Sequence, residues 1–174
     1  PAANPAEADA LAAQARIALR AAAERATALG SHEQALAFLG QALEITTDPA
    51  DRAALHTSAV ASARMGLDGA VVLHHAEAAV TERRRTGDRE AIAIATADLA
   101  RTHRGELSDP ARGLSIAVEA WSDFSDLEQT PAGVALMSAI ASGHRGLVNN
   151  EDAMAWVDRL LPIAERLGLL EETI

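Results

Sequence analysis

The sequence contains no cysteine, no tyrosine and no lysine among its 174 residues. Without cysteine it can form neither a disulfide framework nor a thiolate zinc site, and it has no thiol nucleophile. Without lysine it cannot complete a phosphate-binding loop of the GxxxxGK type. These absences exclude several classes of catalytic and nucleotide-binding site before any fold is considered.

Positive charge is also in short supply. The chain has 15 basic residues, all arginine, against 25 acidic ones, so its formal net charge is −10. This excess argues against a nucleic-acid backbone as the main partner, because such partners need a basic stripe. No apolar run approaches the roughly 18 residues of a membrane span, and no signal-peptide pattern is visible. We therefore expect a cytoplasmic protein that binds neither nucleic acid nor membrane.

The two ends suggest a piece of a longer protein. The chain begins at Pro1 without an initiator methionine, and it stops at Ile174 without a polar tail. We expect an excised or processed segment, with residues 1–174 forming one domain.

What the sequence does contain is helix-forming residues. Alanine alone accounts for 42 positions, and leucine, arginine, glutamate and glutamine supply much of the rest, whereas period-2 runs of β-branched residues are missing. Helix start and stop signals divide the chain at regular distances. The pattern predicts about eight helices, at residues 6–29, 32–46, 49–65, 68–85, 88–104, 109–125, 130–146 and 150–167.

Capping signals support these divisions. A Ser31 cap with Gln34 three residues later resembles a capping box. Aspartate or threonine followed by proline predicts three further helix starts, because these side chains cap well and proline fits the first helical position. Those three pairs are Asp48-Pro49, Asp109-Pro110 and Thr130-Pro131, and Gly66, Gly105 and Gly146 are expected to close the helices before their turns.

Glycines mark an internal repeat. Gly30, Gly66, Gly105 and Gly146 follow one another at spacings of 36, 39 and 41 residues. The third and fourth units also share the sequence His-Arg-Gly, at residues 103–105 and 144–146. A period in this range with two helices per unit indicates a helical solenoid.

The spacing of Gly30, Ala35 and Ala42 resembles the tetratricopeptide repeat (TPR), which has a small residue at the hairpin and alanines five and twelve residues later. The later units fit more loosely. The resemblance implies an all-α, right-handed superhelix (α-solenoid) of about four TPR-like antiparallel hairpins. The four repeats would span residues 6–46, 49–85, 88–125 and 130–167.

The segment from Arg83 to Ala91 is similar to junctions in a longer form of this repeat. Arrays of that form occur in large bacterial regulators, including LuxR-type proteins, regulatory ATPases and adenylate or guanylate cyclases. The resemblance implies that any nucleotide chemistry would lie outside this segment.

In a TPR-like stack the odd-numbered helices line the concave face. We expect eight residues there to form a groove for a peptide with acidic and apolar anchors. They are Arg20, His56, Val60, Arg64, Leu99, His103, Ile140 and His144.

Two of these residues have an alternative role. His103 and His144 lie near predicted helix C-termini, where positive groups favour the carbonyl end of the helix dipole. Simple helix capping explains both positions as well as a groove does.

Neither a metal site nor a catalytic site is predicted. His74 and His75 point about 100° apart on a helix and cannot chelate one metal, so one should pack between helices and the other meet solvent. The arginine run 83–85 stands alone on an acidic chain and suits the end of a helix better than a nucleic acid. No nucleophile–base pair is visible, so we expect no cofactor and no enzymatic activity.

The prediction is a non-catalytic scaffold that binds a protein or peptide, or other domains of its parent chain. Two alternatives remain open. One is a domain that senses a small ligand or peptide, and the other is an intramolecular or self-association module, such as a homo-oligomer.

Overall fold

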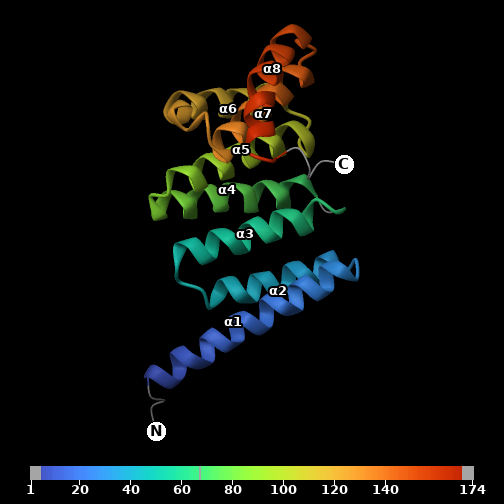
Figure 1. The fold of residues 1–174 in the computed structure, drawn as a ribbon. Coiled ribbons are helices and arrows are strands. Elements are labelled where there is room, and N and C mark those ends of the chain that lie inside the picture. The colour runs from blue at the N-terminus through green and yellow to red at the C-terminus, as the bar shows by residue number, and fades with distance from the viewer. Residues whose placement is uncertain (1–4, 67, 170–174) are drawn as a thin grey trace. The chain divides into compact units, whose positions relative to one another are not determined.

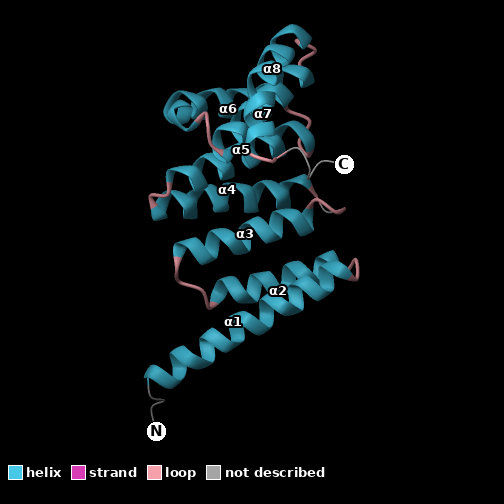
Figure 2. Ribbon diagram, viewed as in Figure 1, coloured by secondary structure: helices cyan, strands magenta, loops and turns pink. Residues whose placement is uncertain are grey.

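The computed structural model describes residues 5–66 and 68–169 of the chain, and Figure 2 shows only helices and connecting turns within them. The predicted all-α fold with eight helices is thereby confirmed for these residues, and every helix end lies within two residues of its predicted position. The helices are α1 (Pro5–Ala28), α2 (His32–Glu44), α3 (Pro49–Ala63), α4 (Gly69–Thr86), α5 (Arg89–Gly105), α6 (Pro110–Phe124), α7 (Pro131–Gly146) and α8 (Asn150–Arg166). A short 3-10 helix, η1 (Ser125–Leu127), which the sequence did not predict, follows α6.

The helices form two compact units, residues 1–82 and residues 83–174. The division falls within the last turns of α4. Within the first unit, successive helices reverse direction at short turns, as Figure 1 shows for α1, α2 and α3. None of the helices in the described parts of the chain combines the length and the apolar character needed to cross a membrane.

The first unit has a small core that is largely built of alanine and leucine. Ala23, Leu39, Ala42, Leu55 and Ala59 form one buried cluster contributed by α1, α2 and α3. Small side chains let helix axes approach closely, and the leucines fill the spaces between them.

An arginine reinforces the same unit. Arg52 on α3 donates from Nε to Glu82 on α4 at 2.7 Å and from Nη1 to the carbonyl oxygens of Leu43 and Thr46 at 2.8 and 3.0 Å. Each of these bonds involves a charged donor and is therefore stronger than a neutral one. Arg52 thus ties the end of α2 and the side of α4 to α3.

The second unit has the larger core. It combines alanines with Leu136 and Ile140 of α7, which are both fully buried. Trp121 on α6 and Trp156 on α8 pack against this core. The centroids of the two rings are 5.4 Å apart, and the rings are nearly perpendicular to each other. Both tryptophans therefore have a packing role in this unit.

Most of the predicted helix starts are confirmed in detail. The side chains of Asp48, Asp109 and Thr130 accept hydrogen bonds from the backbone N–H three residues later, each directly before a proline. The Ser31 capping box is wrong, because the Ser31 side chain makes no capping hydrogen bond.

The glycines predicted to close helices lie at helix ends, but with different backbone conformations. Gly30 and Gly66 adopt positive φ angles of 73° and 127° after α1 and α3. Gly105 and Gly146 are the last helical residues of α5 and α7, and the left-handed residues that follow these two helices are Ser108 (φ 53°) and Val148 (φ 64°). Gly146 serves close packing instead, since a Cβ there would lie 2.7 Å from Cβ of Pro110.

Candidate functional site

The first unit has a groove between α1 and α3, here called the α1–α3 groove. It has a volume of about 460 Å³. It is lined by Arg20, Ala23, Glu24, Thr27 and Ala28 from α1, Leu39 from α2, and Ala54, Leu55, Ser58, Ala61 and Ser62 from α3. The first two odd-numbered helices therefore do share a groove, and six of its eleven lining residues are apolar, four of them alanine.

Alanines create the groove. A helix face of alanine leaves space where a larger side chain would project, and Leu39 and Leu55 close the floor. The far end is held by a hydrogen bond between the hydroxyl groups of Thr27 and Ser62, at 3.2 Å. Apolar surface in a concave site favours an apolar ligand group, because its burial removes both surfaces from water.

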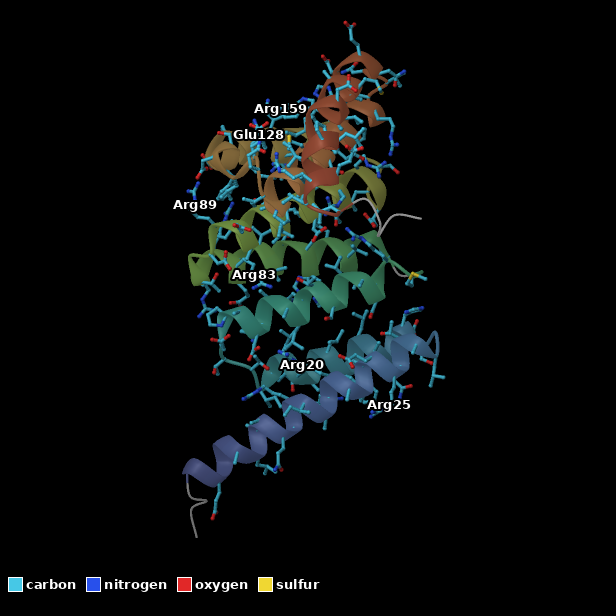
Figure 3. All side chains as sticks on the ribbon, in the orientation of Figure 1. Arg20, Arg25, Arg83, Arg89, Glu128 and Arg159 are labelled. Atoms are coloured by element: carbon cyan, nitrogen blue, oxygen red, sulfur yellow. The ribbon has the colours of Figure 1, made fainter. Side chains whose placement is uncertain are left out.

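Arg20 supplies the positive charge at this groove, and Glu24 supplies a negative one. Its Nη2 donates to the carboxylate of Asp51 on α3 at 3.2 Å, and Figure 3 labels its position on α1. Its Nε is buried and has no hydrogen-bond partner. A buried donor without an acceptor is costly, so a ligand carbonyl or carboxylate that reached it would gain more than an ordinary surface contact.

Arg20 is the one predicted site residue that lines this groove. His56 and Val60 are buried, each 6% exposed, and neither lines it. Arg64 is exposed and follows the last residue of α3. No sequence signal distinguished the alanines of the groove from the many others, and for that reason most of its lining was missed.

His56 instead faces α4. Its Nδ1 lies 3.0 Å from Nδ1 of His75, so one ring donates and the other accepts. Burial, aided by the nearby His75 and Arg52, lowers the pKa of His56 to about 4. Burial also lowers the pKa of His75, with His74 adding to the effect.

The arrangement joins α3 to α4 through a neutral imidazole pair. His74 is exposed, so the prediction that one of the two adjacent histidines packs between helices and the other meets solvent is confirmed. In the described ranges, no three histidine, aspartate or glutamate side chains converge in a way that could hold a metal ion.

The remaining predicted residues lie in the second unit. Ile140 is fully buried in the core, and Leu99 packs against that core from α5. Burial places Ile140 out of reach of any ligand on the surface. Leu99 and Ile140 lie at the same distance before Gly105 and Gly146, and the environment that they share is the core of the second unit.

His103 and His144 occupy the last turns of α5 and α7. Nδ1 of His144 lies 3.6 Å from a carboxylate oxygen of Asp152 on α8. Nδ1 of each histidine is buried without a hydrogen-bond partner. Both positions suit a positive charge at a helix C-terminus, as the alternative interpretation expects.

No protein-family model matches the chain, and no curated protein is significantly similar to it. The α1–α3 groove, with its leucine floor and the buried Nε of Arg20, is the candidate site of the first unit.

A cluster of ring and charged groups in the second unit has a structural role. Arg159 on α8 lies over the rings of Trp121 and Trp156, at 5.2 and 5.4 Å from their centroids. It also donates two hydrogen bonds to Glu128, at 2.7 and 2.8 Å, and Figure 3 shows the two side chains close together. The bond from Arg159 lowers the pKa of Glu128. These contacts hold α8 in place, with Arg159 in contact with Glu128 and with both tryptophan rings.

Proposed function

We propose that this chain is a non-catalytic interaction scaffold, which binds a peptide segment of a protein partner in the α1–α3 groove. The observation that carries the proposal is the groove itself, about 460 Å³ in volume and floored by Leu39 and Leu55. Grooves between helices commonly receive a few apolar anchors of a peptide. The apolar lining supports such anchors, and the buried Nε of Arg20 supports an acidic or carbonyl group beside them.

The experiment selects peptides from a displayed random library on the wild-type protein and measures their affinities for groove variants. Ser58 is exposed and lines the groove, so Ser58→Trp should fill it, whereas Thr57→Trp changes an exposed neighbour on the same helix outside the lining. We expect Ser58→Trp to weaken binding about tenfold or more, and Thr57→Trp to leave it unchanged, since one blocked apolar anchor is worth about 1.5–3 kcal/mol.

Arg20→Ala tests the polar half of the proposal. Peptides that carry a carboxylate should lose more affinity on this variant than their amide counterparts, because the charge-assisted bond is lost only for the former. Selected peptides that bind Ser58→Trp and wild type equally would contradict the assignment of the groove. An unenriched library would contradict the scaffold function itself.

A small-ligand sensor is the second candidate, favoured by the size of the same groove. Sites for drug-sized molecules have volumes of about 300–1,000 Å³, and the groove falls in this range. A metabolite library scored by the shift in unfolding temperature separates the candidates. A ligand whose stabilising effect disappears in Ser58→Trp would favour sensing over peptide binding.

We further propose that the chain is a TPR-like repeat region of a larger bacterial regulator, with its hairpins continuing as a right-handed superhelix. The repeat spacing and the junction-like segment at residues 83–91 support this. The open reading frame that encodes the chain tests it: a nucleotide-binding or cyclase domain in the same frame is expected, and a frame without one would contradict it.

A further inference from the structure

The sulfur atoms of this chain belong to three methionines, since it has no cysteine. These methionines differ in exposure. Met137 on α7 is fully buried, whereas Met65, which follows α3, is 65% exposed and Met154 on α8 is 56% exposed. Peroxides oxidise a thioether that they can reach, so the folded chain presents two sulfur atoms to an oxidant and protects the third.

The two exposed methionines have different surroundings. Met65 lies in the turn after α3 and lines a cavity together with Gly66 and residues 30–34. Met154 lies within α8 and lines a groove between α7 and α8, here called the α7–α8 groove, which has a volume of about 430 Å³. A chemical change at Met154 therefore alters a surface formed by two helices, whereas a change at Met65 alters a turn.

The α7–α8 groove combines apolar and hydrogen-bonding groups. Its apolar lining is Ala141 from α7 with Ala153, Met154, Val157 and Leu160 from α8, and its polar lining is Ser138, Ser142 and Arg145 from α7 with Asn150 from α8. Asn150 lies four residues before Met154, so the two side chains are neighbours on one face of α8. Arg145 extends from the last turn of α7. The thioether of Met154 is a weak acceptor for the donors of these residues.

We propose that Met154 is a site of reversible oxidation by peroxides, at which formation of methionine sulfoxide makes the apolar side of the α7–α8 groove polar. The sulfur donates a lone pair to one peroxide oxygen, and the O–O bond breaks. With hydrogen peroxide, the second oxygen leaves as water after it takes the proton of the first. Sulfur thus loses two electrons, which the peroxide gains. The new oxygen on sulfur accepts hydrogen bonds, and the N–H groups of Arg145 and Asn150 belong to the same groove.

Peroxide treatment of the folded chain, followed by mass spectrometry of its tryptic peptides, tests the site. Trypsin cleaves this lysine-free chain after arginine, so the three methionines fall on separate peptides, which are residues 65–83, 113–145 and 146–159. We expect the peptide of Met154 to gain one oxygen at least about tenfold faster than that of Met137, because Met137 is reached only when the second unit opens. In concentrated urea the rates of the three methionines should become alike.

The peptide of Met154 also contains Trp156, and fragment masses show which of the two residues carries the oxygen. Oxygen on Met154 in the folded chain supports the proposal. If Met154 is oxidised as slowly as Met137, or if the oxygen lies on Trp156, the proposal is overturned.

Two variants test the effect on the groove and its reversal. Met65→Leu keeps Met154 as the exposed sulfur, and Met154→Leu is the matched control that keeps Met65. In nuclear magnetic resonance spectra, peroxide should shift the signals of Arg145 Nε–H and of the Asn150 side-chain amide in Met65→Leu but not in Met154→Leu. A methionine sulfoxide reductase should return both signals to their original positions.

Three outcomes of this second test would overturn the proposal. One is that the Arg145 and Asn150 signals stay unchanged when Met154 is oxidised. Another is that the reductase fails to restore them. The third is a loss of helical circular dichroism on oxidation, since the sulfoxide would then disrupt the fold and not only the groove surface.

Discussion

His56 shows how a single side chain depends on its surroundings. It is 6% exposed and shares a hydrogen bond with His75, 3.0 Å away across the contact of α3 with α4. Burial is the largest cause of its lowered pKa, and the positive charge of Arg52 on the same helix adds to it, while Glu82 on α4 opposes it. A histidine that is neutral in the folded state and charged in the unfolded state makes stability depend on pH.

The sign of this dependence follows from the pKa of His56, which is about 4 in the folded chain against the ordinary 6.5 of a histidine in water. Between these values the unfolded state binds more protons, so the free energy of unfolding should fall as the pH falls from 6.5 to 4. We expect a loss on the order of 1 kcal/mol, because solvent near the pair weakens the full effect.

Urea unfolding at several pH values, followed by circular dichroism, measures this loss. His56→Gln should remove most of the pH dependence that wild type shows in this window, and His74→Gln, at an exposed position on the neighbouring helix turn, should retain it. Equal slopes in wild type and His56→Gln would assign the dependence to other groups.

At the scale of the helix, glycines of this chain differ in the space that their surroundings leave for a side chain. A Cβ on Gly113 of α6 would lie 2.5 Å from the carbonyl oxygen of Ala100 on α5, and this distance is shorter than atoms tolerate. A Cβ on Gly40 of α2 meets nothing within 4 Å. Both residues are helical, so the same substitution should have opposite effects.

Gly113→Ala should destabilise the second unit by about 1–3 kcal/mol, because the helices must separate to admit the methyl group. Gly40→Ala should stabilise the first unit by about 0.5–1 kcal/mol, because alanine loses less backbone entropy in a helix. Thermal unfolding of both variants measures the difference. A neutral Gly113→Ala would mean that α5 and α6 can move apart without cost.

At the scale of the whole chain, the two compact units have separate cores. One buried cluster contains Leu55 and lies wholly in the first unit, and the other contains Leu136 and lies wholly in the second. Both tryptophans belong to the second unit, and the chain has no tyrosine. Fluorescence therefore reports on the second unit alone, whereas far-ultraviolet circular dichroism reports on helices of both.

This division allows a paired experiment. Leu136→Ala should lower the midpoint of the fluorescence transition in urea, with a loss of about 2–5 kcal/mol from the second unit. Leu55→Ala should leave that midpoint unchanged. The part of the circular dichroism signal that comes from the first unit should instead be lost at a lower urea concentration than in wild type. If Leu55→Ala lowers the fluorescence midpoint as much as Leu136→Ala does, the chain unfolds as one cooperative body.

Local signals account for what could be predicted. The aspartate–proline pairs at residues 48–49 and 109–110 located helix starts because a cap and the residue it serves are neighbours in the chain. The ion pair of Asp98 with Arg101 is likewise local, because the two residues lie one helical turn apart. Ser31 failed as a cap although its spacing was right, because capping also requires a particular orientation of the side chain.

The amino-acid sequence by itself determined the helices and their approximate ends, because each depends on residues a few positions apart. Only the tertiary structure decided which alanines line a groove and which are buried, since the sequence does not show which residues each of the 42 alanines contacts. It likewise turned His56 toward His75 and Ile140 into the core. Contacts between helices depend on residues distant in the chain, and a periodic pattern gives the face of a helix but not the helix that covers it.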